Sequence, residues 1–595
     1  MKQKSDDTGL RGLKTLLPYL KERWAILAAG FAFMLVQNYG AMMVPTYFQK
    51  ILDEVTGANR APVVWQLIGM ACLWAGITVV SLYGMRRLII GASRTIEYSL
   101  RRRIHGRLLE LDYAFFQAHE TGDLVSRTTN DLDNVRTLLG PGVMYIPNSL
   151  SMFVFFFPVL FRLNGPLMLV VSGVLVLVIA LIFVVLPRLA PLYRRIQEAT
   201  GTINSRVWQV VSGISTVKLH TMEGQEEERF RELNRDFLKR NMATVRVQEA
   251  LWPLFGFVFA ITQLVIIFVG GSFVISGAMS LGQLLQFNVM ITALTFPVLS
   301  LGWIMSLLQQ GISAMGRINT ILHGPDELRE DWQSPGAEHL SFDVRALTFT
   351  YPKQTRPALR DVSLSIGPGD FIGITGTIGS GKTTLINLLT GLLRPPRGTV
   401  FVNGIDIRDI EPAQLFARMG VVSQSPFLFS RSLAANIAMG ADGKGSDDAV
   451  REAATLAGLS HDVASFAEGY GQLIGERGIT LSGGQKQRTA IARALLRHGS
   501  VVILDDSLSS VDARTESAII DNLLSLRANR TLIVISHRIS PLKAADRIYV
   551  MDDGAIAEVG THAALADGTG LYSRLVRLQQ LEKKLADPED EEAVG

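Results

Sequence analysis

The chain has 595 residues, a formal net charge of +4, a hydrophobic fraction of 48% and a single cysteine. A chain of this length exceeds one hydrophobic core, so several domains are expected. The small net charge, with basic residues confined to particular loops, disfavours a nucleic-acid-binding protein. The lone cysteine, Cys72, excludes an intramolecular disulfide and a cysteine-rich metal site, and because it lies in an apolar run we expect it to be buried.

The first half of the chain is predicted to cross a membrane six times. Residues 1–23 are expected to include an interfacial helix, because leucines there are interleaved with basic residues. A membrane domain follows over 24–316, with uncharged runs at 24–49, 61–85, 137–161, 163–187 and 250–316. At about 1.5 Å per residue, each of the first four runs can cross a hydrocarbon core of about 30 Å. The fifth is too long for one span, and a break between Gly270 and Gly282 is predicted to divide it into two helices.

The loops between these runs predict the orientation of the spans. Residues 86–136 carry nine arginines and residues 188–249 carry eleven basic residues, whereas the opposite loops carry only Lys50, Arg60 and Arg162. Basic residues concentrate in the cytoplasmic loops of membrane proteins. Both termini and both long loops are therefore predicted to be cytoplasmic. The long loops are expected to extend the spans as helices, with glycine-containing bends at 115–136 and 213–230.

Amide side chains lie within the predicted spans, but no acidic or basic ones do. Hydrogen bonding between helices is the favoured interpretation of these amides, and contact with a substrate is the alternative. The lack of intramembrane charge disfavours a proton relay or an ion-coupled carrier. The amide residues are Gln37, Asn38, Asn148, Gln263, Gln283, Gln286 and Asn288.

The second half begins with a polar linker predicted over 317–340, followed by a soluble domain over 341–578 and an acidic tail over 579–595. An apolar strand at 371–375 leads into a glycine-rich segment and then an apolar helix pattern, which is the spacing of a P-loop in its required context. Loop amides at such a helix start face phosphate oxygens, the lysine neutralises phosphate charge and the hydroxyl of Thr383 can bind Mg²⁺. The predicted phosphate-binding residues are Gly376, Thr377, Gly379, Ser380, Gly381, Lys382, Thr383 and Thr384.

Two further motifs follow in the soluble half. The apolar run VVILD, residues 501–505, predicts a second strand ending in Asp505, a carboxylate suited to Mg²⁺. The run LSGGQKQR, residues 481–488, places a hydroxyl and several backbone amides at the start of a helix, aimed at an anionic oxygen. Taken alone, this second motif could be a simple N-capped helix. Its predicted binding residues are Ser482, Gly483, Gly484 and Gln485.

Together these motifs resemble the nucleotide-binding domain of ATP-binding cassette (ABC) transporters. Six spans joined to one such domain resemble a half-transporter of the type IV exporter group, so the expected fold is an α-helical six-span transmembrane domain fused to an α/β P-loop nucleotide-binding domain. The resemblance implies ATP and Mg²⁺ as cofactors. It implies that Tyr351 stacks on adenine and that Gln424 senses Mg²⁺ and relays to the membrane domain. It also implies that His537 contacts the γ-phosphate and that Asp512 signals across a dimer.

In this family each ATP lies between the P-loop of one chain and the LSGGQ motif of another, which implies a dimer working by alternating access. Asp506 departs from the pattern, because the family places a glutamate there to orient or activate the attacking water. An aspartate is shorter by about 1.5 Å, and loss of a positioned base lowers a rate by roughly 10² to 10⁴. The run LDDSLSSVD is similar to the degenerate-site subunit of heterodimeric bacterial multidrug-type exporters, which implies a partner that supplies the catalytic glutamate.

Leu473, in QLIGERG, stands where exporters of this group often carry an acidic residue. This change puts coupling through that contact in question, and a substitution without effect is equally open. The resemblance implies ATP-driven export of hydrophobic or amphipathic compounds, such as drugs, lipids or peptides, through a bacterial plasma membrane. A homodimer with two slow sites and an ATP-gated channel or regulator are alternatives. An importer subunit is disfavoured because the two domains are fused.

Overall fold

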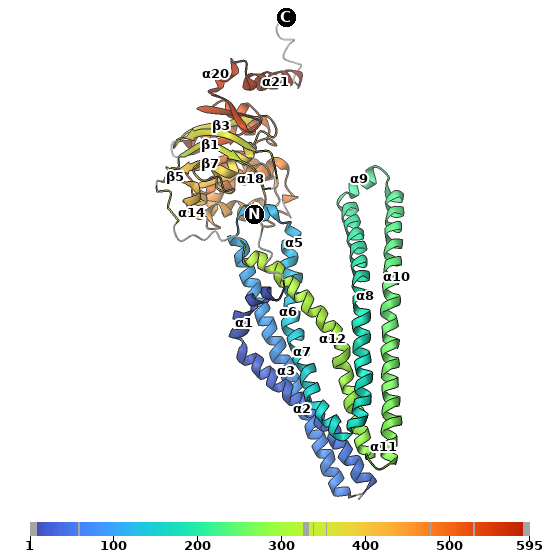
Figure 1. The fold of residues 1–595 in the computed structure, drawn as a ribbon. Coiled ribbons are helices and arrows are strands. Elements are labelled where there is room, and N and C mark those ends of the chain that lie inside the picture. The colour runs from blue at the N-terminus through green and yellow to red at the C-terminus, as the bar shows by residue number, and fades with distance from the viewer. Residues whose placement is uncertain are drawn as a thin grey trace. The chain divides into compact units, whose positions relative to one another are not determined.

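The computed structural model describes residues 9–57, 60–324, 332–336, 338–352, 354–475, 478–527 and 530–586. The chain divides into two compact units (Figure 1). The helical unit comprises Met1–Leu111 and His119–Pro325, and the α/β unit comprises Asp112–Ala118 and Asp326–Gly595. The acidic run at 587–592 and the first eight residues lie outside the described residues.

The helical unit is built from long helices that follow the apolar runs of the sequence. Figure 1 shows α8 and α10 running side by side and joined by the short α9. The elements are η2 Leu10–Leu16, α1 Leu17–Glu22, α2 Trp24–Thr56, α3 Ala61–Glu110, α5 Thr121–Ser126, η3 Arg127–Asp131, α6 Leu132–Thr137, η4 Leu138–Gly142, α7 Val143–Leu163, α8 Gly165–Ser212, α9 Ile214–Leu219, α10 Glu223–Val265, η5 Ile266–Gly270, α11 Gly271–Ile275 and α12 Leu281–Leu322.

Five helical stretches among the described residues are long and apolar enough to cross a membrane. They are Trp24–Thr56, Ala61–Glu110, Thr121–Leu163, Gly256–Ile275 and Leu281–Leu322. The remaining predicted span, 163–187, falls largely in α8, where Gly165–Val174 is apolar and several later side chains lie outside the described set. The helical membrane domain expected from the sequence is therefore present.

The chain reverses between α11 and α12, inside the predicted interval from Gly270 to Gly282. Gly270 itself remains helical, as the last residue of the π-turn η5, and the turn falls at 276–280. There the Ser280 hydroxyl accepts a hydrogen bond from the Gln283 amide at 3.0 Å, and the Gln283 side chain accepts one from the Ser280 amide at 2.8 Å. This capping box fixes the start of α12, so the intramembrane amide of Gln283 has a capping role.

Other amide side chains in the spans join neighbouring helices. Asn38 on α2 donates to the side-chain oxygen of Asn148 on α7 at 3.1 Å, and also to the hydroxyl of Ser151. The prediction of hydrogen bonding between helices is confirmed for these residues. The interhelical pairs are Asn38 with Asn148, Gln286 with Thr46, and Asn288 with Gln263.

The expectation that Cys72 is buried is wrong, because its side chain is exposed on α3. A helix that crosses a membrane has apolar residues on its lipid-facing side as well as in its core, so an apolar neighbourhood does not predict burial there. The linker prediction also needs adjustment. Helix α12 continues to Leu322, into the segment 317–340 that was expected to be linker.

The α/β unit contains two sheets. A four-stranded sheet has the order β2-β1-β4-β5, and a six-stranded sheet has the order β10-β9-β3-β8-β7-β6. In the larger sheet β6, β7, β8, β3 and β9 are parallel, and β10 is antiparallel at one edge. The strands are β1 Phe342–Phe349, β2 Leu359–Ile366, β3 Phe371–Gly376, β4 Val400–Val402, β5 Ile405–Asp406, β6 Met419–Val422, β7 Val501–Asp505, β8 Thr531–Ile535, β9 Arg547–Asp552 and β10 Ala555–Gly560.

Both faces of the six-stranded sheet are buried, which explains the unbroken apolar runs of its central strands. Along β7, Val502 and Leu504 join a core with the helices on one face, whereas Val501 and Ile503 join a core with the second sheet on the other. The helices are α4 Tyr113–Ala118, α13 Lys382–Leu389, α14 Pro412–Ala417, α15 Leu433–Ala438, α16 Asp447–Leu456, α17 Ser460–Ser465, α18 Gly483–Leu496, α19 Ala513–Ser525, α20 His562–Ala566 and α21 Leu571–Ala586.

Helix α21 crosses the domain boundary that the sequence suggested. The predicted soluble domain ended at residue 578, with an acidic tail from 579, yet α21 continues without interruption to Ala586. Neither proline nor glycine occurs within Leu571–Ala586, and leucines continue at helical spacing, so nothing in the sequence ends the helix at 578. Residues 579–586 therefore belong to the folded α/β unit.

Candidate functional site

Four parallel strands end at one edge of the six-stranded sheet, and each is followed by a predicted site residue. Strand β3 leads into Gly376, β7 ends at Asp505, β8 precedes His537, and β6 precedes Gln424. The pairings of β3 with β8, β8 with β7 and β7 with β6 are all parallel. Carboxyl ends of parallel strands form the usual ligand-binding edge of an α/β sheet. Residues as far apart in the sequence as Gly376 and His537, which are 161 positions apart, are thereby brought to one edge of the sheet.

The glycine-rich loop after β3 has a backbone that only glycine fits well. Gly376, Gly379 and Gly381 have φ angles of 143°, 81° and 95°. A Cβ atom at Gly376 would lie 1.9 Å from the carbonyl oxygen of Met551, so any side chain there would clash with β9. Gly381 is the N-cap of α13 in the left-handed conformation. The loop therefore presents its amides at the amino end of α13, where the helix dipole favours an anion.

Lys382, the first residue of α13, extends under the same loop. Its ammonium group donates to the carbonyl oxygens of Gly376 and Thr377 at 3.1 and 2.8 Å, and lies 3.3 Å from the hydroxyl of Ser380. Burial lowers the pKa of Lys382, and the carboxylates of Asp505 and Asp506 oppose that effect. The loop thus holds a partly desolvated positive charge, which an anionic ligand would stabilise.

Asp505 lies at the end of β7 and is 4% exposed. Burial raises the pKa of its carboxyl group, against the lowering effects of a hydrogen bond from Thr383 and the charge of Lys382. A buried carboxylate beside a hydroxyl provides the hard oxygen ligands that Mg²⁺ prefers. No cluster of three or more acidic, histidine or cysteine ligands occurs in the described part of the chain. The Asp505 carboxylate and the Thr383 hydroxyl are oxygen ligands of the kind that would fit a Mg²⁺ ion.

Asp506 adopts a left-handed backbone conformation with a φ of 46°. Its amide donates to the carbonyl of Ile535 at 2.9 Å, which ties the residue to the end of β8. Its carboxylate accepts a hydrogen bond from the side chain of Gln424 at 3.4 Å. Aspartate is among the residues that tolerate this conformation best. Asp506 and Gln424, separated by 82 positions in the sequence, are thereby placed together.

His537 follows β8, and the charges of Lys382 and Asp506 both affect its pKa. Burial and the nearby charge of Lys382 lower the pKa of His537, and the carboxylate of Asp506 partly opposes this shift. The lowered pKa favours the neutral form of the imidazole. A neutral ring can donate one hydrogen bond without adding another positive charge beside Lys382.

Tyr351 contacts the P-loop helix α13. Its hydroxyl is 3.1 Å from the hydroxyl of Thr384, and its ring packs edge-on against Phe349 with a centroid distance of 5.2 Å. The hydroxyl of Thr377 donates to Asp552 at 2.8 Å, which attaches the P-loop to the end of β9. Tyr351 and the P-loop residues are thus held as one cluster.

The LSGGQ residues make their contacts elsewhere in the same unit. Ser482 is the N-cap of α18, and it exchanges hydrogen bonds with Gln485 at 3.3 and 2.9 Å. The Gln485 side chain also donates to Asp462 at 3.0 Å. A Cβ atom at Gly484 would lie 2.8 Å from the carbonyl oxygen of Ser510, so a glycine is needed at this close approach. The motif forms a capping box, as its sequence allows, with Ser482 and Gly483 exposed and Gly484 and Gln485 partly exposed.

Asp512 caps α19 by accepting a hydrogen bond from the Thr515 amide at 2.9 Å, and this bond lowers the pKa of Asp512. Leu473 is 64% exposed and pairs with Ser432 through an isolated β-bridge. Glu476 and Arg477, which follow it in the QLIGERG run, lie outside the described residues.

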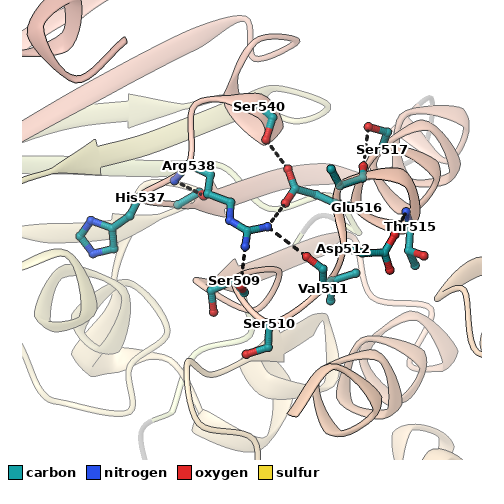
Figure 2. A network of polar contacts seen from close by, with 12 residues as sticks. Ser509, Ser510, Val511, Asp512, Thr515, Glu516, Ser517, His537, Arg538 and Ser540 are labelled. Carbon is teal, nitrogen blue, oxygen red and sulfur yellow. Dashed lines mark hydrogen bonds and ion pairs between the residues drawn. The ribbon is translucent and has the colours of Figure 1, made fainter. Parts of the chain in front are cut away.

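Sequence reasoning missed the residues that hold the loops of the site. Arg538 donates to the carbonyl oxygens of Ser509 and Val511 at 2.7 and 3.0 Å, and to the carboxylate of Glu516 at 2.8 Å (Figure 2). Glu516 is 2% exposed and also accepts a hydrogen bond from Ser540. A charged residue this deeply buried is rare without a partner. Its place on α19 gave no signal, because the pairing depends on the tertiary fold.

Comparisons with known proteins agree with this arrangement. A family model described as the ABC transporter transmembrane region matches residues 27–298, and one described as ABC transporter matches residues 359–509. YheI of Bacillus subtilis, named as a probable multidrug resistance ABC transporter ATP-binding/permease protein, is 32% identical over 96% of this chain and 98% of its own length. The chain belongs to the ABC transporter family.

Further matches extend over nearly the whole transporter. The ATP-dependent lipid A-core flippase of Thiobacillus denitrificans is 31% identical over 95% of this chain and 97% of its own length. The structure of a bacterial Atm1-family ABC exporter with ATP bound superposes with a TM-score of 0.77 at 24% identity, covering 95% of this chain and 98% of that one. The fold is accordingly that of an ABC exporter, with a helical transmembrane domain fused to an ABC ATPase domain.

Proposed function

We propose that the transporter is one half of a heterodimer that exports hydrophobic or amphipathic compounds at the expense of ATP, and that its own ATP site hydrolyses slowly. The observation that carries the proposal is Asp506, which directly follows Asp505 at the end of β7 and contacts Gln424. In this family a glutamate at that position serves the attacking water. The shorter aspartate keeps its carboxylate near the backbone and bonded to Gln424.

The roles of the remaining site residues follow from their placement. The P-loop amides and Lys382 would hold the phosphates, and Tyr351 would stack on the adenine. Thr383 and Asp505 would hold Mg²⁺, which neutralises charge on the transferred phosphoryl group when bound. Gln424 would complete the Mg²⁺ site and His537 would contact the γ-phosphate. The intact first turn of α18 would face the ATP held by the partner subunit.

The effect of an aspartate in place of a glutamate on the barrier to ATP hydrolysis can be estimated. A positioned general base contributes roughly 10² to 10⁴ in rate, or about 3 to 5 kcal/mol of barrier. This chain would still bind ATP, because its P-loop, Asp505 and Thr383 keep the residue types of the family pattern. Binding of two ATP molecules would close the dimer and open the cavity outward, and hydrolysis at the partner's glutamate would reset it.

The direction and setting of transport are part of the proposal. The excess of basic residues in the long loops supports a cytoplasmic location for the α/β unit and both termini. The names of YheI and the lipid A-core flippase refer to multidrug resistance and to a lipid, which supports a hydrophobic or amphipathic cargo carried through a bacterial plasma membrane. Drugs, lipids and peptides all fall within that class.

The decisive experiment compares ATP turnover of this chain purified alone with that of the chain purified together with the product of its neighbouring gene. We expect turnover to be slow for the chain alone and fast for the pair. Robust hydrolysis by the chain alone would contradict the heterodimer and favour a homodimer. Transport is tested with a labelled hydrophobic dye and inside-out vesicles, in which an exporter accumulates dye with ATP and a channel only equilibrates it.

A further inference from the structure

The loop that carries His537 is held by a residue of the C-terminal helix α21. The Gln579 side chain donates to the carbonyl oxygen of His537 at 2.6 Å and accepts a hydrogen bond from the amide of Ile539 at 2.9 Å. A carboxamide has one acceptor and one donor end, so it can satisfy two peptide groups at once. Gln579 therefore spans the loop immediately after His537 and fixes the peptide units on both sides of Arg538.

Helix α21 is itself firmly attached to the α/β unit. Tyr572 is fully buried and Val576 is 9% exposed, and both belong to the same core as Ile539. The Tyr572 hydroxyl lies 2.8 Å from a ring nitrogen of His562. Residues 572, 576 and 579 are spaced four and three apart, so they share one face of the helix. The position of Gln579 is thus set by the core and not by a mobile surface.

The same loop is also held by Arg538. Its guanidinium group bonds to two carbonyl oxygens of the 509–511 segment and to buried Glu516, and Ser540 also bonds to Glu516. Figure 2 shows the imidazole of His537 directed away from this network. The loop is thereby held both by the contacts of Arg538 with the 509–511 segment and Glu516 and by the two hydrogen bonds of Gln579, and the His537 ring takes part in neither set.

We propose that Gln579 is a positioning residue for His537, through which helix α21 sets how strongly this site prefers ATP to ADP. The inference rests on the proposed contact of His537 with the γ-phosphate. A ring held in one orientation binds that phosphate without losing further conformational freedom. When the two hydrogen bonds of Gln579 are removed, the loop must be ordered during binding. This ordering would lower the affinity for ATP. It would not lower the affinity for ADP, which lacks the γ-phosphate that His537 would contact.

The test uses the full-length transporter, with its partner subunit where one copurifies, and photolabelling of this chain by azido-ATP and azido-ADP under conditions without turnover. Gln579→Leu keeps most of the side-chain volume and loses both hydrogen bonds. Loss of one hydrogen bond worth about 1 kcal/mol corresponds to roughly a fivefold change, and loss of two corresponds to roughly 30-fold. We therefore expect the apparent affinity for the ATP analogue to fall by roughly fivefold to 30-fold, with that for the ADP analogue unchanged.

Two variants serve as controls and one as a second test. Gln580→Leu makes the same chemical change at the neighbouring exposed position of α21 and should alter neither affinity. His537→Ala should lower the preference for ATP at least as much as Gln579→Leu. Gln579→Glu keeps the acceptor for Ile539 but faces the His537 carbonyl with a carboxylate, so it should also lower the preference. Unchanged ADP labelling shows in each case that the site is folded.

The outcomes distinguish the positioning role of Gln579 from the proposed contact of His537 with the γ-phosphate. If His537→Ala lowers the preference for ATP and both Gln579 variants match the Gln580 control, the positioning role of Gln579 is wrong and the proposed function stands. If His537→Ala leaves the preference unchanged, the assigned contact of His537 is wrong, and the inference about Gln579 fails with it. Equal losses of ATP and ADP labelling in Gln579→Leu also overturn the inference, since a specific effect on the γ-phosphate is then absent.

Discussion

Asp512 has a structural function within its own chain that is separate from any signal to a second subunit. Its carboxylate caps α19 through the Thr515 amide at 2.9 Å. Replacing an aspartate N-cap by alanine destabilises a helix by about 1 kcal/mol. We expect Asp512→Ala to lower the free energy of unfolding of the α/β unit by that amount, measured by thermal or denaturant unfolding of the purified transporter.

A second substitution at the same position separates capping from charge. Asparagine caps a helix as well as aspartate does, so Asp512→Asn should restore stability while removing the carboxylate. If signalling across a dimer needs the charge, ATP turnover of the assembled transporter should fall in both variants. Wild-type turnover in Asp512→Asn would show that capping is the only role of the residue.

Adjacent amides on helix α2 have different surroundings, although sequence reasoning treated them alike. Asn38 is fully buried and donates to Asn148 on α7 at 3.1 Å. The side-chain oxygens of Gln37 and Asn38 are both buried and accept no hydrogen bond from the described residues, so what distinguishes Asn38 is the hydrogen bonding of its amino group to α7. Hydrogen bonds between membrane helices contribute about 0.6 kcal/mol on average and about 1.7 at most. Asn38→Leu should therefore destabilise the membrane domain by about 1 kcal/mol.

Gln37→Leu is the matched control for that prediction. It makes a similar change one position away, but it removes a buried acceptor that lacks a partner, which costs free energy where it is left unsatisfied. We expect Gln37→Leu to be neutral or slightly stabilising in thermal unfolding in detergent or lipid. Equal destabilisation by the two variants would show that the α2–α7 hydrogen bond contributes nothing specific.

Local motifs were predictable from the sequence, whereas contacts between distant elements were not. The P-loop and the strand ending in Asp505 were predictable, because the relevant chemistry lies within a few consecutive residues next to a strand or helix start. The exposure of Cys72 and the contacts of Gln579 were not, because both depend on which face of a helix meets another element. An apolar run gives no such direction in a membrane helix, and the end of α21 carries no local stop signal before Ala586.

At the scale of the whole molecule, the start of α18 is proposed to act on the ATP site of the partner subunit and not on this chain's own site. Ser482 and Gly483 are the exposed residues there. A Cβ atom at Gly483 would lie 3.5 Å from the Ser510 side chain, an ordinary contact, whereas one at Gly484 would meet the Ser510 carbonyl at 2.8 Å. Gly483 is therefore the position at which a side chain can be added without a clash inside the chain.

In the proposed heterodimer, Gly483→Asp in this chain should lower ATP turnover of the pair on the order of 100-fold, the scale on which an oxyanion-stabilising donor acts. The added carboxylate would face the ATP held by the partner's P-loop. Asp506→Ala should change the same turnover less than about threefold, because the slow site contributes little to the total turnover. A threefold change corresponds to about 0.7 kcal/mol of barrier. Both are measured on the copurified pair, with thermal unfolding as the folding control. Equal losses would mean that Asp506 is a working base, and the chain would then hydrolyse ATP at its own site.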